Sequence, residues 1–286
     1  MFNKEPIRRI IIGLAMLLTV GNAFAQKNGP YAPWFFIQLT DPQFGMFENN
    51  AGYEKETALY EKAVVSINKL NPDFVVITGD FVNDSKSDAQ INEFKRITSK
   101  INKGIPVYYT PGNHDLGNIP DKQSLTRYKK NYGRDQFAFT HKGCDFIGFN
   151  SSFIKAGIQP SEQKQFKWLT RELKKGRKAT HIILFCHYPF FNKAADEPEA
   201  YSNIQPAYRE KYLSLFESHN VAAVFSGHYH NNALNQYKGV QLITTSALGK
   251  PLGKAPSGMR IVKIYHDKIE YEYDGLDELP DLIDFH

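Results

Sequence analysis

The sequence predicts an α/β fold, a four-layer α/β/β/α sandwich of two mixed sheets flanked by helices. Short apolar runs alternate with helix-like stretches between residues 35 and 225, a pattern typical of β-α units. Residues 240–273 are rich in β-forming residues with no helical stretch between them, which indicates antiparallel strands completing a second sheet. No repeat or Pro/Gly-rich linker divides the chain, so residues 26–286 are interpreted as a single domain.

The predicted elements follow one another with short connections. In the first part of the chain, strands are expected over 35–39, 74–77 and 107–109, with helices over 54–70 and 89–101. The pattern continues with strand 146–149, helix 161–174, strand 181–185, helix 207–219 and strand 221–225. Three further strands, 240–245, 260–265 and 269–273, complete the prediction. The helices are predicted from amphipathic stretches and the strands from short apolar runs.

The first 25 residues are typical of a secretory signal peptide. Positive residues at positions 4, 8 and 9 precede an uncharged apolar run over 10–20, and the small residues at 23–25 fit a signal-peptidase site. A membrane anchor is the alternative, but this run is shorter than the roughly 20 residues that cross a bilayer. We therefore expect cleavage after Ala25, a periplasmic or secreted protein, and no stable membrane span in the mature chain.

Charge and cysteine content exclude some classes of protein. The formal net charge is +5, and losing Lys4, Arg8, Arg9 and Glu5 with the signal peptide would lower it to +3. This mild excess is scattered without a Lys/Arg block, so no nucleic-acid partner is expected. Cys144 and Cys186 both lie in apolar stretches. They are interpreted as buried free thiols, with a single disulfide as the alternative in an oxidising compartment.

Polar side chains follow five of the predicted strands at the point where each strand ends. In chain order they are Asp41 and Gln43, Asp80 and Asn83, Asn113 and His114, His187, and finally His228 and His230. In an open α/β sheet, ligands bind beyond the carboxyl ends of the strands, so these side chains are expected to gather at one edge. Glycines at 79, 112 and 227 suit tight turns in which backbone approaches a ligand.

The residue types indicate a metal site. Carboxylate, amide and imidazole groups without thiolates suit first-row divalent metals better than calcium or a structural zinc. His228 and His230 are two residues apart, so in extended chain they point the same way and could each serve one of two adjacent metals. Each signal alone has a simpler interpretation: Asp41-Pro42 as a turn, and His187 as a hydrogen-bonded residue at a strand end. Their joint order favours a dinuclear site.

This order of residues resembles the calcineurin-like metallophosphoesterases. The blocks of that family are D-x-H, G-D-x-x-[ND], G-N-H-[DE], H and G-H-x-H, and the similarity extends over about residues 34–275. Within the family, the chain is most similar to the calcineurin-like phosphoesterase-domain-containing phosphatases. That similarity lies in the Asp-Pro-Gln of the first block and in segments 225–232, 245–249 and 258–262.

The resemblance implies a role for each matching position. The first metal would be bound by Asp41, Asp80 and His230, with Gln43 in place of the family's usual His; Asp80 would bridge to a second metal completed by Asn113, His187 and His228. His114 would be the general acid, and Asn83 stands where some family members have an Asp paired with that His. Asp84 replaces the phosphate-binding Arg of the phosphoprotein phosphatases. The cofactors would be two divalent ions: manganese, iron, zinc or magnesium.

The function expected is hydrolysis of phosphate esters. A phosphomonoesterase would use a metal-bridging hydroxide in an in-line displacement while His114 protonates the leaving group, acting on a phosphorylated small molecule or a phosphoprotein. Two alternatives stay open: a phosphodiesterase acting on nucleotides or other diesters, and a catalytically inactive, metal-stabilised phosphate-binding protein. For His114 the alternative is a residue that only holds Asn113 or Asp80 in place. Substrate, native metals and oligomeric state are not indicated.

Specificity is expected to come from loops beyond the strands. In residues 188–206, Phe190, Phe191 and Tyr201 are predicted to form an aromatic wall beside the metals, and Lys250 and Lys254 are either phosphate contacts or ordinary surface residues. An amide oxygen at Gln43 is harder and usually weaker as a ligand than imidazole. We therefore predict a weaker first site that tolerates manganese or magnesium.

Overall fold

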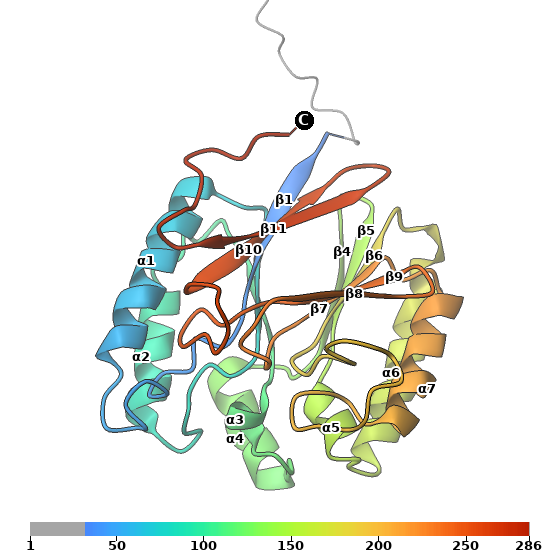
Figure 1. The fold of residues 1–286 in the computed structure, drawn as a ribbon, viewed down its shortest axis with the longest axis horizontal. Coiled ribbons are helices and arrows are strands. Elements are labelled where there is room, and N and C mark those ends of the chain that lie inside the picture. Colours follow the sequence, from blue (N-terminus) through green and yellow to red (C-terminus); the bar gives the residue numbers. More distant parts are fainter. Residues whose placement is uncertain (1–31, 286) are drawn as a thin grey trace, which may run out of the picture.

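The computed structural model describes residues 32–285. The predicted signal peptide and its cleavage site lie outside these residues. Two sheets lie face to face, and helices cover their outer faces (Figure 1). No helix within residues 32–285 combines the length and apolar character that crossing a bilayer requires.

The first sheet has the strand order β11-β10-β1-β2-β3. Its strands are β1 (Trp34–Leu39), β2 (Val75–Thr78), β3 (Val107–Thr110), β10 (Gly258–Ile264) and β11 (Ile269–Gly275). Strands β1, β2 and β3 are parallel, while β10 runs antiparallel to β1 and β11 antiparallel to β10. The loops that follow β1, β2 and β3 therefore leave the same edge of the sheet.

The second sheet has the order β4-β5-β6-β7-β9-β8. Its strands are β4 (Phe137–His141), β5 (Cys144–Gly148), β6 (Ile182–Phe185), β7 (Ala223–Ser226), β8 (Ala233–Tyr237) and β9 (Val240–Thr244). The four inner strands β5, β6, β7 and β9 are parallel, and the edge strands β4 and β8 are antiparallel to their neighbours.

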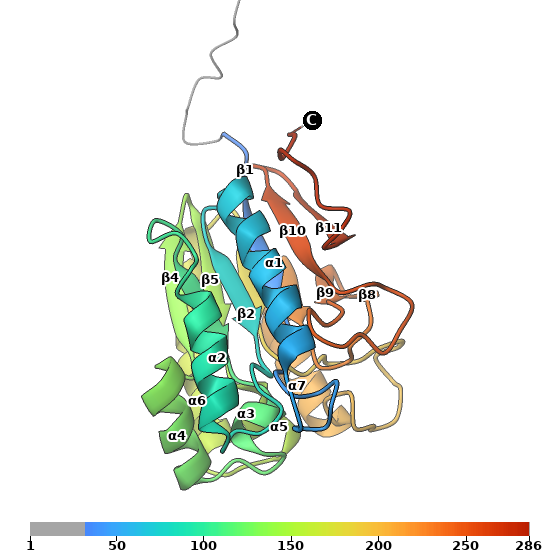
Figure 2. The same ribbon diagram turned by 90° about the vertical axis from the view of Figure 1, so that its left-hand side faces the viewer.

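Helices form the two outer layers. They are α1 (Glu54–Leu70), α2 (Asp88–Thr98), α3 (Asn113–Leu116), α4 (Lys122–Tyr132), α5 (Ser151–Lys155), α6 (Ser161–Lys175) and α7 (Pro206–Ser218), with a 3₁₀ turn at Gly176–Lys178. Helices α1 and α2 lie side by side against the first sheet (Figure 2), whereas α6 and α7 cover the second. This arrangement confirms the predicted α/β/β/α sandwich.

Strand β1 illustrates why the sheets must be covered on both faces. Successive side chains of a strand point to opposite sides. Phe35, Ile37 and Leu39 pack in the core with α1 and α2, whereas Trp34 and Phe36 pack between the sheets. All six residues of the strand are buried, and fully burying one Phe contributes about 1.5–3 kcal/mol.

The C-terminal strands pair differently from the prediction. We expected the strands after residue 240 to complete the second sheet together, but only β9 joins it, parallel to β7. Strands β10 and β11 instead extend the first sheet next to β1. Strand propensity is local, whereas the choice of partner depends on which sheet edge the chain reaches. Strands β4 and β8 and helix α4 were not predicted.

Both cysteines are buried free thiols, which confirms the simpler interpretation. Cys144 lies in the core between the sheets and Cys186 in the core under α7. Burial raises the pKa of the Cys144 thiol to about 11. Because the thiolate is the reactive form, Cys144 is a packing residue at neutral pH.

Candidate metal centre

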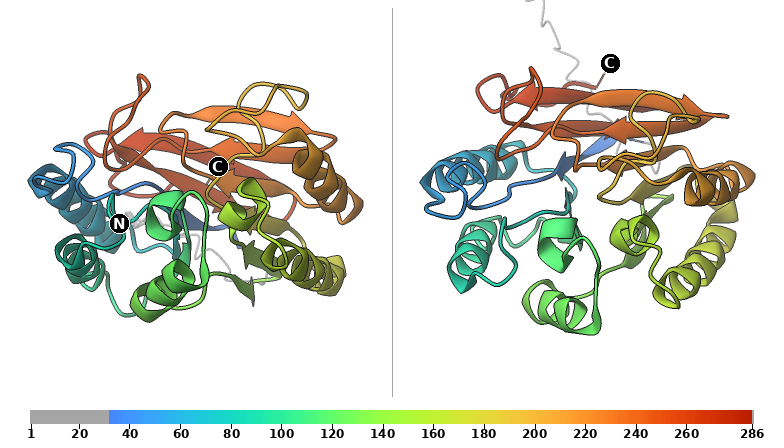
Figure 3. Two further views of the ribbon diagram at one scale, coloured as in Figure 1. Left: turned by 90° about the horizontal axis from the view of Figure 1, so that it is seen from below. Right: turned by 60° about the horizontal axis from the view of Figure 1, so that its bottom comes forward.

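The loops that follow β1, β2, β3, β6 and β7 converge at the end of the molecule where α3 lies (Figure 3). In these loops, five of the predicted site residues have left-handed backbone: Asp41, Gln43, Asp80, His228 and His230. This conformation costs a non-glycine residue about 1–3 kcal/mol and is concentrated at functional sites. The surrounding fold therefore holds these five side chains in directions that a relaxed turn would not give them.

The site contains two groups of potential ligands that share one carboxylate. Asp80, His187 and His228 form the first group, and Asp41, Asp80 and His230 form the second. Within each group, one ligand atom from each residue lies within 4.8 Å of the others. All five side chains are buried. Because Asp80 belongs to both groups, its carboxylate could help to hold a cation in either of them.

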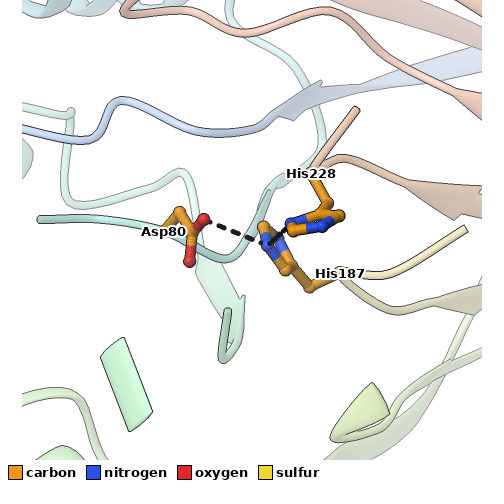
Figure 4. Close-up of side chains that lie close together, drawn as sticks. All are labelled: Asp80, His187 and His228. Atoms are coloured by element: carbon orange, nitrogen blue, oxygen red, sulfur yellow. Dashed lines mark hydrogen bonds and ion pairs between the residues drawn. The ribbon is translucent and has the colours of Figure 1, made fainter. Parts of the chain in front are cut away.

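His187 is the centre of the first group (Figure 4). Its Nε2 lies 3.2 Å from Asp80 Oδ2, from Asn113 Oδ1 and from His228 Nδ1. Four atoms with lone pairs thus meet around one point, and a cation there would bind all of them. Asn113, which the sequence predicts as a ligand, is the first residue of α3 and belongs to the Gly-Asn-His-Asp segment 112–115.

Each of the three histidines has one ring nitrogen against a backbone carbonyl. The pairs are His187 Nδ1 with Thr78 O at 2.8 Å, His228 Nε2 with Tyr201 O at 3.2 Å, and His230 Nδ1 with Lys250 O at 2.7 Å. A carbonyl only accepts, so in the neutral ring the proton sits on that nitrogen and the other nitrogen carries the lone pair that a metal ion would use. In His187 and His230 that other nitrogen lies 3.2 Å from a carboxylate oxygen, of Asp80 and of Asp41 respectively. In His228 it lies 3.2 Å from His187 Nε2, so all three nitrogens face the ligand groups, as in histidines that bind metals.

Two oxygens in the site lack a hydrogen-bond donor. Asp41 Oδ2 accepts from Thr40 Oγ1 at 2.5 Å and from His228 N at 3.0 Å. Asp41 Oδ1 lies 3.2 Å from His230 Nε2, which carries the lone pair in the neutral ring, and accepts no hydrogen bond from residues 32–285. Gln43 Nε2 donates to Asn83 Oδ1 at 3.1 Å, and Gln43 Oε1 is likewise buried without a donor in this part of the chain. A buried unpaired acceptor costs about 1–3 kcal/mol. A cation would satisfy both oxygens, so the residues present fit a metal site.

Electrostatics hold the carboxylates in their ionised form. Burial alone raises the pKa of Asp80, but the nearby His187 and His114 outweigh burial and hold that pKa below its usual range. The same competition between burial and the neighbouring His230 and His187 lowers the pKa of Asp41. Conversely, burial lowers the pKa of His187, but Asp80 and Asp41 outweigh it and raise that pKa to about 9. A proton on His187 and a metal ion therefore compete for the same nitrogen.

His114 is anchored by its own backbone and by a neighbouring loop. Its backbone N–H donates to Asp80 Oδ1 at 2.8 Å, and its ring Nδ1 lies 2.9 Å from the backbone carbonyl of Asn83. We expected the side chain of Asn83 to orient this ring. Instead that side chain accepts from Gln43 and donates to Asn50 Oδ1 at 2.8 Å. The turn after β2 thus directs the backbone carbonyl of Asn83 to His114 in the loop after β3, and its side-chain amide to Gln43 in the loop after β1.

An open cavity of about 250 Å³ lies beside His114. It is lined by Asn83, Asp84, Ser85, Asn113, His114, Gly117, Asn118 and Tyr201. The expected aromatic wall is therefore wrong for Phe190 and Phe191. Both are buried in the core against α7, where Phe190 lies edge-on to Phe216 at 5.3 Å. Only Tyr201 of the three lines this cavity.

The two lysines considered as phosphate contacts lie in the loop after β9. Lys250 places its Nζ 5.8 Å from the centre of the Phe47 ring, and its contact with the site is the backbone carbonyl that accepts from His230. Lys254 is exposed. These contacts favour the interpretation of both lysines as ordinary loop residues.

Asp115 has a structural role that the sequence analysis did not assign. Its carboxylate accepts from the backbone N–H groups of Asp80 at 2.8 Å, Phe81 at 3.0 Å and Gly112 at 2.8 Å. It therefore joins the loop after β2 to the loop after β3. The two loops are so close that a Cβ on Gly112 would lie 2.0 Å from Asp80 Oδ1. Asp115 is the fourth residue of the Gly-Asn-His-Asp segment, and its place in that motif was the feature of the sequence that could have indicated this role.

Arg260 is a second residue whose role was missed. This buried side chain on β10 donates from Nε to Thr245 Oγ1 at 2.7 Å and from Nη2 to Asn232 Oδ1 at 2.8 Å. Asn232 also accepts from Ser246 N, and Ser246 Oγ donates to the carbonyl of His230. Burial lowers the pKa of Arg260 to about 10, so it stays charged at neutral pH. It connects the first sheet to the loop that carries His228 and His230.

Comparisons with known proteins agree with this geometry. The sequence profile of the calcineurin-like phosphoesterase family matches residues 36–232, which include both ligand groups. The serine/threonine-protein phosphatase CPPED1 of Rattus norvegicus is 36% identical over 266 residues, covering 86% of this chain and 85% of the rat protein. The Homo sapiens protein of that name is 35% identical over 276 residues, covering 89% and 88%.

Among solved structures, a dimetal phosphatase from Danio rerio superposes with a TM-score of 0.64 at 17% identity. The superposition covers 86% of this chain and 97% of the zebrafish protein. At this identity the likeness shows a shared fold.

Proposed function

Because this chain belongs to the calcineurin-like phosphoesterase family and is a dinuclear-metal-dependent phosphoester hydrolase, we propose that it is a phosphomonoesterase. Its substrates would be phosphorylated small molecules or phosphoproteins. The observation that carries the proposal is the pair of ligand groups sharing Asp80, next to an open cavity that contains His114. Relatives at 35–36% identity are named serine/threonine-protein phosphatases, which supports a monoester substrate.

The proposed ligands follow from the two groups. One cation would be held by Asp41, Gln43, Asp80 and His230, and the other by Asp80, Asn113, His187 and His228. Two divalent cations bound in this way activate water and withdraw charge from the phosphoryl oxygens. The protein contributes fixed ligand directions, because the carbonyls of Thr78, Tyr201 and Lys250 each fix the orientation of one imidazole, through Nδ1 in His187 and His230 and through Nε2 in His228.

His114 is proposed to act as the general acid. Its Nδ1 faces the carbonyl of Asn83, its backbone N–H donates to Asp80, and the residue lines the cavity, so Nε2 is the ring nitrogen that would serve as the acid. As the bond between phosphorus and the ester oxygen breaks, Nε2 would give its proton to that oxygen. Proton transfer of this kind typically contributes about 10²–10⁴-fold to the rate. Asp80 would act as a ligand of the cations, and Asn83 would position His114 through its backbone carbonyl.

The cavity favours a small or protein-borne phosphate over a polynucleotide. Its lining includes Asp84 and no Lys or Arg. Proteins that follow a nucleic-acid backbone use Lys and Arg contacts to its phosphates. A cavity without Lys or Arg leaves recognition of the phosphoryl group to the metal ions and to neutral donors of the lining such as Ser85 and Asn118.

Export from the cytoplasm is part of the proposal. We infer cleavage after Ala25 and a periplasmic or secreted mature domain of residues 26–286, from the charged start, the short apolar run and the small residues at 23–25. Mass spectrometry of protein recovered from the periplasmic or extracellular fraction should find Gln26 at the amino terminus. An intact Met1 on protein held in the membrane fraction would contradict export by cleavage.

The decisive assay compares p-nitrophenyl phosphate with bis-p-nitrophenyl phosphate, using mature protein loaded in turn with manganese, iron, zinc and magnesium. Asn113→Ala and His114→Ala test the site. His219→Ala is the matched control. This half-buried histidine follows α7 and precedes the amino end of β7, whereas His228 follows the carboxyl end of that strand, so the two histidines lie at opposite ends of β7. Monoester hydrolysis lost in both site variants and kept in the control is the expected result.

Two other outcomes would select the alternatives. Faster cleavage of the diester than of the monoester would favour a phosphodiesterase. Bound metal with no turnover of either ester would favour a phosphate-binding protein without catalysis.

A further inference from the structure

Tyr201 contacts two of the proposed ligands of the second cation, although it belongs to none of the five motifs. Its backbone carbonyl lies 3.2 Å from His228 Nε2, and its hydroxyl oxygen accepts from Asn113 Nδ2 at 3.1 Å. Its ring lies against His228, with 4.9 Å between the ring centres. One residue of the loop between β6 and α7 thus contacts the ends of β3 and β7.

Both hydrogen bonds direct a ligand atom inward. With Nε2 of His228 engaged by the carbonyl, its Nδ1 faces His187 Nε2 at 3.2 Å. With Nδ2 of Asn113 engaged by the hydroxyl, its Oδ1 faces the same nitrogen at 3.2 Å. A cation binds the oxygen of an amide and not its NH2 group, so Asn113 can serve as a ligand only with Oδ1 turned inward. The hydroxyl of Tyr201 holds Nδ2 on the outer side and thereby keeps Oδ1 in that orientation before an ion binds.

The loop that carries Tyr201 is held on both sides of that residue. The carboxylate of Glu197 accepts from the backbone N–H groups of Asn192, Lys193 and Ala194 and from Asn203 Nδ2. Arg209, which is buried at the start of α7, donates to the carbonyls of Ala195, Glu197 and Ile204. Tyr201 is therefore placed by a network of polar contacts anchored on the buried Arg209, while Tyr201 itself is 60% exposed.

We propose that Tyr201 is a positioning residue that sets the affinity of the second metal site, through its carbonyl on His228 and its hydroxyl on Asn113. The inference rests on the proposed function, because it takes Asn113, His187 and His228 as ligands. Outer contacts of metal ligands typically change affinity by about 10–100-fold. The hydroxyl is the part that can be removed without touching the carbonyl or the ring.

The test is manganese binding to the full mature chain, measured by isothermal titration calorimetry without substrate. Tyr201→Phe should weaken one of two sites about 10-fold and leave the other unchanged. Saturating manganese should then restore most of the turnover of p-nitrophenyl phosphate. The control is Tyr208→Phe on α7, whose hydroxyl contacts Gln159 Nε2 at 3.4 Å; it should bind manganese like the wild type.

A double-mutant cycle shows whether the effect passes through Asn113. Tyr201→Phe should cost little further affinity once Asn113→Ala has been introduced, because the two residues act as one unit. If the wild type binds two ions and Tyr201→Phe binds them with unchanged affinities, the inference is overturned while the proposed function stands. If Tyr201→Phe lowers only kcat/KM, Tyr201 contacts substrate and does not position metal ligands. A wild type without two manganese sites would overturn both proposals.

Discussion

His187 Nε2 lies 3.2 Å from Asp80 Oδ2, at a point where strand ends of different sheets meet. Asp80 follows β2 in the first sheet, and His187 follows β6 in the second. The second ligand group also spans the sheets, because Asp41 follows β1 and His230 follows β7. The proposed metal ions would therefore fasten the two halves of the sandwich together at the edge that carries the chemistry.

Metal removal should destabilise the fold because the ligands come from both sheets. A ligand that binds only the folded state adds about 2.7 kcal/mol at a concentration 100 times its Kd. Differential scanning calorimetry should show a lower Tm after chelation and recovery on adding manganese. An unchanged Tm in a chain shown to bind two ions would mean that the site does not couple the sheets.

The metal-free chain should lose stability as the pH rises toward and past 9. Burial lowers the pKa of His187, but Asp80 and Asp41 raise it to about 9, above the unfolded value of about 6.5. The protonated form is thus favoured by folding, and its contribution is complete below pH 6.5 and lost as the pH passes 9.

Urea unfolding of chelated protein at pH 6.5, 8 and 9.5 measures this loss. Manganese-loaded protein is the comparison, because a cation at Nε2 replaces the proton and removes that dependence. Metal-free protein that is more stable at pH 9.5 than at 6.5 would contradict the assignment of this proton to His187.

Gln43→His should change metal preference. An imidazole at this position is a softer and stronger ligand for zinc or iron than an amide oxygen, so competition titration should find the zinc-to-manganese affinity ratio raised at least about 10-fold at one site. Asn83→Ser is the control: it removes the acceptor that orients Gln43 at 3.1 Å without supplying a new ligand. It should weaken manganese binding and leave the preference as it was. Unchanged preference and affinity in Gln43→His would show that residue 43 does not bind metal.

Asp115→Asn should destabilise the protein although the change is nearly isosteric. The carboxylate serves three backbone N–H groups, and a carboxamide replaces one accepting oxygen by a donor. An unsatisfied buried donor costs about 1–3 kcal/mol, which chemical denaturation resolves. The matched control is Asp121→Asn at the N-cap of α4, where Asn and Asp are nearly equivalent. Equal losses in the two variants would argue against a special role for Asp115.

The motif residues could be identified from the sequence because their signals are local. Predicted strands of three to five residues precede Asp41, Asp80, Asn113, His187 and His228, and the structure places each of these residues shortly after the end of a strand. The layered fold could be predicted for the same reason, since strand β1 has to be buried on both faces and helical stretches were available to cover the sheets.

The contacts between these loops could not be predicted. Asp115 bonds to Asp80, Tyr201 to Asn113, and Arg260 to Thr245 and Asn232 across intervals in the chain that no periodicity relates. The side chain of Asn83 faced Gln43 where His114 was expected, because the local turn decides between its amide and its carbonyl. Edge strands β4 and β8 lack the continuous apolar run that reveals an inner strand, since their residues alternate between half-buried and exposed.

Sequence patterns alone indicate which residues carry the chemistry, in which order, and that strands and helices alternate around them. The packed fold is needed to see that β10 and β11 join the first sheet, that the ligands come from two sheets, and that Tyr201, Asp115 and Arg260 hold them in place. The two kinds of information differ in how far apart in the chain the interacting residues lie. Burial and backbone conformation are imposed residue by residue, so sequence patterns record them. The meeting of side chains far apart in the chain depends on how whole sheets pack, and no segment of the sequence contains that information alone.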